Sequence, residues 1–396
     1  MLPPPGCANK CCSCWYKYVL FRTAGMYPAP LKGKVATMQQ PVAERLDGEP
    51  QRFASLEDRI HASLATAAIG DALGAPTEQR SIREIQELFG GRVETFFEPP
   101  QDSPYAKGRR AGQITDDSSQ MMMLAERFVE GGGEVTAAAV ADMVVTWASD
   151  PAFFPHFAGP STRRAVEALR AGADPETIGA EGRETTMGTS NGGAMRVAPA
   201  GLVNPGSIEQ AVEAAATTCR PSHFTNVGVA GAGAIAAAVA IALRDDATII
   251  DVVRAAREGA LRGAEIGGRD GRDSAGASVY ARIGTAVAIA IASDGLDSAV
   301  AEIADTVGSG LHAAEAVPAA IGCFVAAGGD PWLTVVAAAN IGDDSDTVAC
   351  MAGAIAGAFS GMSRVPAWAY DRIVEENDLD IEGLAARVAR VARERI

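Results

Sequence analysis

Residues 343–359 read DDSDTVACMAGAIAGAF, a polar start followed by small and apolar residues. Asp, Ser and Thr are favoured at helix N-termini because their side chains bond free backbone N–H groups, and alanine is the strongest helix former. The stretch therefore predicts a helix that begins within DDSDT and continues to about residue 359. Its small side chains predict close contact with neighbouring helices.

The same helical pattern recurs along most of the chain. From about residue 56, alanine is abundant and apolar residues recur three and four positions apart. Further helices are expected near residues 135–147, 227–243, 249–261, 275–292, 311–326 and 381–391. Residues 92–97 are the best short strand candidate, and no fixed-period repeat is present. We expect one compact all-α domain, a multi-helix bundle, over residues 54–396.

Composition limits the possible partners. The chain has 396 residues with 34 Lys and Arg against 49 Asp and Glu, a net charge of −15. This acidic excess argues against binding to a nucleic-acid backbone or an anionic membrane, because both require basic patches. No stretch reaches the roughly 20 continuous apolar residues of a membrane span, so a cytoplasmic protein is expected. With 4 His and 7 Cys, a metal would be bound mainly by oxygen.

The first 37 residues differ from the rest. They hold Cys7, Cys11, Cys12 and Cys14 and no acidic residue. A zinc or redox site is disfavoured because no second Cys pair has zinc-like spacing, and a signal peptide because the apolar segment is too short. We expect a disordered leader over residues 1–53, with Met38 as a possible native start.

Two acidic segments stand at predicted helix starts. Residues 115–118 (TDDS) precede good helix formers, and residues 343–347 (DDSDT) precede the helix described above. One acidic residue suffices to cap a helix, and each additional one adds like-charge repulsion. A bound cation relieves that repulsion, and Asp and Thr oxygens suit Mg²⁺ or Mn²⁺. If the segments meet, they predict a dinuclear site with metals about 3.5–4 Å apart.

Four other segments are candidates for the same site. Residues 70–74 (GDALG) and Glu78 could cap and turn a helix, or place Asp71 or Glu78 over the metals as a base, acid or gate. Residues 188–196 (GTSNGGAMR) could form a common turn or approach an anionic ligand. His223 at a helix start could be a packing residue. Residues 308–318 (GSGLHAAEAVP) could be a turn or a ligand border.

Taken in order, these motifs resemble the ADP-ribosylglycohydrolase family, and the resemblance covers about residues 56–360. It implies an all-helical fold with a dinuclear Mg²⁺ or Mn²⁺ centre in a cleft. The metal ligands that it implies are Thr115, Asp116, Asp117, Asp344, Asp346 and Thr347. For substrate binding it implies Ser190, Asn191, Gly192, Met195, His223, Gly308 and Gly310. The catalytic residues expected are Glu78, Asp116 and Asp346.

The resemblance implies hydrolysis of a ribosyl glycosidic bond in a small molecule or an ADP-ribosylated protein. One loop departs from the family pattern. Members that act on ADP-ribosylated arginine typically have Asp-x-Gly-x-Thr-Thr, whereas residues 157–162 read FAGPST. Phe157 therefore stands at the Asp position, and a phenyl ring can neither pair with a guanidinium nor carry a proton. We expect poor activity on ADP-ribosyl-arginine.

Two alternatives remain. A nucleoside or simple ribosyl hydrolase keeps the reaction and changes the substrate, and Phe157 favours it because a base could stack there. A non-catalytic structural or binding relative is a different class, and loss of metal ligands would indicate it.

Overall fold

Helices account for the regular structure of residues 54–396, which are the residues that this computed structural model describes. The segment expected as a leader lies outside them. The described part contains no β-strand, only two isolated bridges, so the all-α prediction is confirmed. The helices of the first half are α3 (Leu56–Gly74), α4 (Ile82–Phe89), α5 (Asp116–Glu130), α6 (Ala137–Trp147), α7 (Phe154–Phe157), α8 (Pro160–Arg170), α9 (Gly192–Met195), α10 (Ala198–Leu202) and α11 (Ile208–Cys219). Those of the second half are α12 (Asn226–Ala242), α13 (Ile249–Asp270), α14 (Val279–Ala292), α15 (Leu296–Thr306), α16 (Ala313–Ala326), α17 (Pro331–Ala339), α18 (Ser345–Ser360), α19 (Ala367–Asn377) and α20 (Ile381–Glu394).

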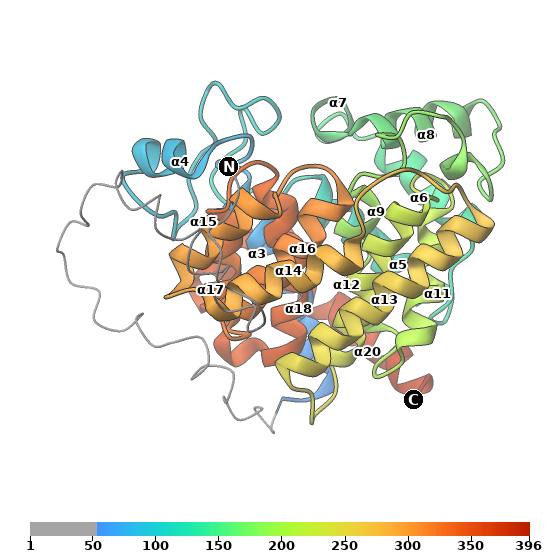
Figure 1. Cartoon of the computed structure of the whole chain (residues 1–396). Coiled ribbons are helices and arrows are strands. Elements are labelled where there is room, and N and C mark those ends of the chain that lie inside the picture. Colours follow the sequence, from blue (N-terminus) through green and yellow to red (C-terminus); the bar gives the residue numbers. More distant parts are fainter. Residues whose placement is uncertain (1–53) are drawn as a thin grey trace, which may run out of the picture. The chain divides into compact units, whose positions relative to one another are not determined.

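The centre of this bundle is built from helices that are apolar on every side. Almost every residue of α12, α16 and α18 is buried. A helix that is apolar all round must be surrounded by other helices. Accordingly, α12 packs along α13, and α18 packs along both α3 and α17 (Figure 1).

Glycines bring α3 and α18 into backbone contact. A Cβ atom added at Gly70 would lie 2.3 Å from the carbonyl oxygen of Ala349, and one at Gly357 would lie 2.2 Å from that of Ala62. No residue larger than glycine fits at such distances. The last turn of α3 is therefore held directly against the first turn of α18, where the acidic residues stand.

The expected strand at residues 92–97 is wrong, because no neighbouring strand completes its hydrogen bonds within the described residues. The side chain of Asn340 takes that role. It accepts from the backbone N–H of Val93 at 2.8 Å and donates to the carbonyl oxygen of Val93 at 2.9 Å. None of the helices between residues 54 and 396 combines the length and the apolar character that a membrane crossing requires.

Candidate functional site

The two acidic segments meet at the N-termini of α5 and α18. Thr115 precedes α5 and Asp344 precedes α18, and neither side chain caps its own helix. Of the six residues proposed as metal ligands, all but Asp116 are at least nine-tenths buried. Burial of uncompensated carboxylates is costly, so this arrangement requires a compensating partner.

Asp71 of α3 serves as the cap of α5. Its carboxylate accepts from the backbone N–H of Thr115 at 3.0 Å, from the Thr115 hydroxyl at 2.8 Å and from the backbone N–H of Ser118 at 3.0 Å. A cap normally comes from the residue just before the helix. Here a different helix supplies it, which fixes α5 to the GDALG turn of α3.

The carboxylates form two groups of three that share one member. Oxygen atoms of Asp71, Asp117 and Asp346 lie within 4.8 Å of one another, and so do those of Glu78, Asp344 and Asp346. Asp346 thus stands between two clusters, which is the arrangement that a pair of cations needs. Acidic groups also gather without an ion, so the fit must rest on further observations.

Two unpartnered atoms and the donor types supply those observations. Oε2 of Glu78 and Oδ1 of Asp117 are buried without a hydrogen-bond partner. Buried carboxylate oxygens are rarely left in this state unless they bind an ion or take up a proton. The available donors are all carboxylate or hydroxyl oxygens, which suit Mg²⁺ or Mn²⁺ rather than a soft metal.

Burial and mutual repulsion change the acidity of the cluster. Desolvation, reinforced by Asp344 and Asp116, raises the pKa of Glu78 well above its usual range. Desolvation likewise raises the pKa of Asp346 well above its usual range, and it raises that of Asp344 to about 6 although Asn191 and Thr347 donate to it. The metal-free site therefore binds protons more tightly than the unfolded chain does.

This difference in proton binding predicts how metal-free stability depends on pH. Because these pKa values are higher in the folded state, the free energy of unfolding decreases as pH rises. For Asp344 the decrease begins near the unfolded pKa of 3.8 and is complete above about 6. Without metal, the melting temperature should be lower at pH 8 than at pH 5. Saturating Mn²⁺ should remove most of this decrease, measured by thermal unfolding with Mn²⁺ or with a chelator. The same pH slope in both conditions would contradict the prediction.

A cleft of about 310 Å³ opens over this cluster. Its floor includes Glu78, Asp116 and Asp346, and Tyr105 and Phe157 stand among its walls. α7 and α8, which supply part of these walls, lie at the upper edge of the helices in Figure 1. The other predicted site residues that line it are Asp117, Ser190, Asn191, Gly192, Met195, His223, Asp344 and Thr347.

A buried hydrogen-bond chain holds Ser190 in place. Arg196 donates to the Ser222 hydroxyl at 2.7 Å, that hydroxyl lies 2.8 Å from Nδ1 of His223, and Nε2 of His223 lies 3.0 Å from the Ser190 hydroxyl. Burial, with Arg196 nearby, lowers the pKa of His223 to about 3, so the ring is neutral. The neutral ring therefore presents one donor and one acceptor nitrogen to the two hydroxyls. The chain fixes the position of the Ser190 side chain, which lines the cleft.

The Asn-Gly-Gly loop lies against the acidic cluster. The amide of Asn191 donates to Oδ2 of Asp344. A Cβ atom at Gly192 would lie 2.9 Å from the His223 ring, so glycine is required there. The backbone N–H of Asn191 donates to the carbonyl oxygen of Leu311, which joins this loop to the turn before α16.

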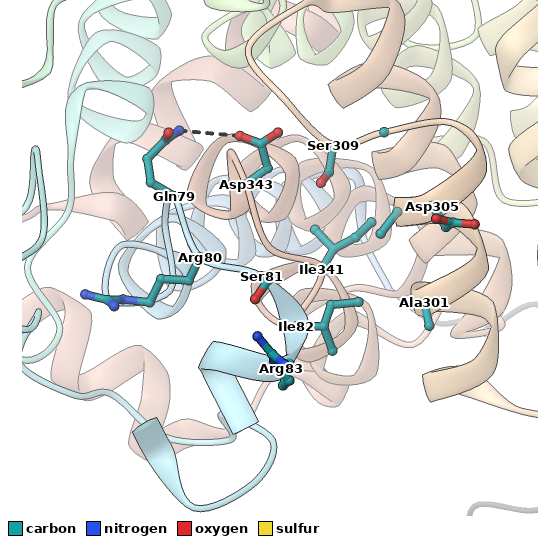
Figure 2. A pocket seen from close by; sticks show the side chains of 12 residues that line it. Gln79, Arg80, Ser81, Ile82, Arg83, Ala301, Asp305, Ser309, Ile341 and Asp343 are labelled. Atoms are coloured by element: carbon teal, nitrogen blue, oxygen red, sulfur yellow. Dashed lines mark hydrogen bonds between the residues drawn. The ribbon is translucent and has the colours of Figure 1, made fainter. Parts of the chain in front are cut away.

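Gly308 and Gly310 do not line the cleft, although Leu311, next to Gly310, does. Gly308 borders a neighbouring groove of about 570 Å³, shown in Figure 2. A Cβ atom at Gly310 would lie 2.7 Å from Oδ2 of Asp343. These glycines therefore shape the turn that carries Leu311.

Two backbone hydrogen bonds join the segment that carries Glu78 to the segment that carries Asp344. The backbone N–H of Gln79 donates to the carbonyl oxygen of Asp343 at 2.7 Å, and the backbone N–H of Asp343 donates to the carbonyl oxygen of Arg80 at 3.0 Å. Gln79 and Asp343 have φ values of 60° and 56°, a region that non-glycine residues rarely adopt. Their side chains also meet, as the dashed line in Figure 2 shows.

Tyr105, which lines the cleft, was not predicted from the sequence. It is 41% exposed, and the polar loop between α4 and α5 carries it. An aromatic residue in a long polar loop was the available signal.

Comparison with known proteins identifies related chains. The ADP-ribosylglycohydrolase family model matches residues 53–396. Escherichia coli K12 YegU, described as uncharacterized, is 29% identical over 346 residues that cover 85% of this chain and 98% of YegU. The ADP-ribosylhydrolase ARH3 of Homo sapiens is 26% identical, with 78% of this chain and 87% of ARH3 covered.

Two further matches extend this comparison. The ADP-ribosylarginine hydrolase Tri1 of Pseudomonas putida GB-1 is 26% identical and covers 78% of this chain and 72% of Tri1. A solved ADP-ribosylglycohydrolase-related protein complex superposes with a TM-score of 0.57 at 22% identity. That match covers 86% of this chain and 99% of the solved one, and it supports the all-helical fold.

Proposed function

Because the chain belongs to the ADP-ribosylglycohydrolase family, we propose that it hydrolyses the ribosyl glycosidic bond of ADP-ribose conjugates with the help of two divalent cations. Family membership and the hydrolase relatives make it a glycosidase-type hydrolase. The observation that carries the metal dependence is the pair of carboxylate groups that share Asp346 at the floor of the cleft. Thr115, Asp116, Asp117, Asp344, Asp346 and Thr347 would hold the cations, which we take to be Mg²⁺ or Mn²⁺.

The residues of the cleft fit the chemistry of a ribosyl bond. Bond cleavage at the anomeric carbon builds oxocarbenium character, which a nearby carboxylate stabilises. Divalent cations held there would orient the ribose hydroxyls and lower the pKa of a bound water. Glu78, whose pKa burial raises, can take a proton from the attacking water or return one to the leaving group.

Ser190 and the neighbouring loop would bind the remainder of the ligand. The Ser190 hydroxyl lines the cleft, where it would contact a phosphate or ribose oxygen. His223 acts through Ser190, because a neutral ring with a pKa of about 3 is a poor proton donor or acceptor near neutral pH. Asn191 would hold Asp344 in place.

A substrate panel tests this proposal. The enzyme is incubated with an O-linked ADP-ribosyl-serine peptide, ADP-ribosyl-arginine and adenosine, each with Mg²⁺, Mn²⁺ or a chelator, and free ADP-ribose or ribose is measured. Metal-dependent release of ADP-ribose from the O-linked conjugate is expected. Release of ribose from adenosine alone would favour the nucleoside hydrolase. Tyr105 and Phe157, which line the cleft, support that alternative because a base could stack on their rings. No release from any substrate would contradict both proposals.

Phe157 also predicts substrate preference. It lines the cleft and offers no charge to a guanidinium. An unpaired guanidinium is costly to desolvate, and a cation–π contact of about 0.5–2 kcal/mol offsets only part of that cost. Phe157→Asp should raise the ratio of kcat/KM for ADP-ribosyl-arginine over the serine conjugate severalfold, whereas the uncharged control Phe157→Leu should not. Efficient wild-type hydrolysis of ADP-ribosyl-arginine would refute this preference.

A further inference from the structure

Arg109 packs on the rings of Phe153 and Phe157, and Phe157 lines the cleft. Its guanidinium carbon lies 4.6 Å from the ring centre of Phe153 and 4.9 Å from that of Phe157. The two rings lie 6.4 Å apart at a tilt of 46°. Phe157 lines the cleft, whereas Arg109 does not, so the cation stands at this wall without being part of the cleft surface.

The charge of Arg109 has no direct counter-ion. Between residues 54 and 396, no carboxylate comes within ion-pair distance of it. Its Nη2 atom is buried without a hydrogen-bond partner. Asp71, Asp150 and Asp116 act on it only at longer range, and its neighbour Arg110 adds repulsion. An arginine side chain remains charged, so a positive field reaches the cleft across Phe157.

We propose that Arg109 is a specificity-determining residue that disfavours a guanidinium leaving group and favours an oxygen leaving group; this rests on the proposed function. In hydrolysis, the oxygen of water bonds to the anomeric carbon and water gives up one proton. The bond from that carbon to the leaving oxygen breaks, and the leaving oxygen keeps the electron pair and takes up a proton. Negative charge develops on that oxygen before the proton arrives, and a nearby cation stabilises it.

A guanidinium leaving group meets the opposite situation. It would bring a second positive charge to the ring of Phe157, one face of which Arg109 already occupies. Like charges at short distance reduce affinity, and the effect is strongest where water is excluded. The arrangement thus opposes arginine conjugates by charge as well as by the absence of an acidic partner at position 157.

The test compares kcat/KM for ADP-ribosyl-serine peptide and ADP-ribosyl-arginine in the full chain. Arg109→Gln should lower the serine-to-arginine ratio about tenfold relative to the wild type. Arg109→Lys, which keeps the charge, should retain most of the ratio. Arg110→Gln is the matched control, because Arg110 pairs with Glu376 instead, and it should leave the ratio unchanged. Melting temperatures show whether each variant folds.

Each outcome separates the two proposals. A purely structural role of Arg109 would lower both activities together, and an unchanged ratio in Arg109→Gln would overturn this inference while the proposed function stands. If the wild type releases ADP-ribose from neither conjugate, the proposed function fails and this inference fails with it. In Phe157→Asp alone, Arg109 would pair with the new carboxylate and compete with the substrate guanidinium. The Phe157→Asp/Arg109→Gln double variant lacks this arginine, so it should favour arginine conjugates more.

Discussion

In the Asp346→Asn variant, metal-dependent release of ADP-ribose is expected to fall by at least about 100-fold, the upper end for loss of a residue that only supports a metal ligand. Asp346 belongs to both carboxylate groups, so its loss would weaken both proposed cation sites at once. Asn keeps the shape of the side chain but removes the charge and one acceptor oxygen. The measurement is kcat/KM on the preferred conjugate at saturating Mg²⁺ or Mn²⁺.

Stability should change in the opposite direction when metal is absent. Burial and the charges of Glu78 and Asp117 raise the pKa of Asp346, so its ionised form destabilises the metal-free fold at neutral pH. Asp346→Asn should therefore melt at a higher temperature than the wild type with a chelator, and it should gain less on addition of Mn²⁺. Calorimetric titration would show the weakened binding directly.

Asp343→Asn provides the matched control for this experiment. Asp343 is three residues away, belongs to neither carboxylate group and lines the neighbouring groove (Figure 2). Its positive φ is one that Asn adopts readily. Activity and metal affinity should stay close to wild type. Equal losses of activity and metal affinity in Asp343→Asn and Asp346→Asn would contradict the prediction. They would mean that the total negative charge of the segment matters, not the carboxylate that the two groups share.

Local sequence signals predicted the fold class and the acidic segments well. Alanine-rich apolar runs predicted α12 and α18 nearly to their ends, because propensity and burial agree there. Helix α13 was expected to stop near residue 261 but continues to Asp270. Gly263 and Gly267 look like helix ends in sequence. Yet a Cβ atom at Gly263 would lie 2.3 Å from the carbonyl oxygen of Val229 in α12, and one at Gly267 would lie 2.4 Å from that of Thr225, the residue before α12. They are contact points, which only the tertiary structure reveals.

The site could be predicted only where charge density made it conspicuous. The segments TDDS and DDSDT exceed what capping requires, and the structure brings them together. Two features depend on pairs of residues that are distant in sequence. Asp71 caps α5 by binding Thr115, and Arg109 packs on Phe157. No local pattern encodes such pairs, because a single Asp at a helix end or a single Arg in a loop has many ordinary explanations.

Gly74→Ala is expected to cost about 3 kcal/mol or more of the free energy of unfolding, at or beyond the upper end for overpacking. A Cβ atom there would lie 2.5 Å from Cα and 2.6 Å from N of Asp346. These are backbone atoms, so no side-chain rotation relieves the clash, and α3 must move away from α18. That movement would separate Asp71 from Asp346 and weaken the first carboxylate group, so metal affinity should fall together with stability.

Gly268→Ala in α13 separates this effect from a general intolerance of alanine. Its new Cβ atom would lie 3.7 Å from the Asn226 side chain, an ordinary contact, and alanine should stabilise the helix by up to about 1 kcal/mol. Urea unfolding of both variants, with Mn²⁺ and with a chelator, measures the difference. If Gly74→Ala matched Gly268→Ala in stability and in Mn²⁺ affinity, backbone contact between α3 and α18 could not be what holds the carboxylates together. The expected divergence of the two variants would instead connect the GDALG turn to the proposed metal site through packing alone, since Gly74 itself offers no side chain to a ligand.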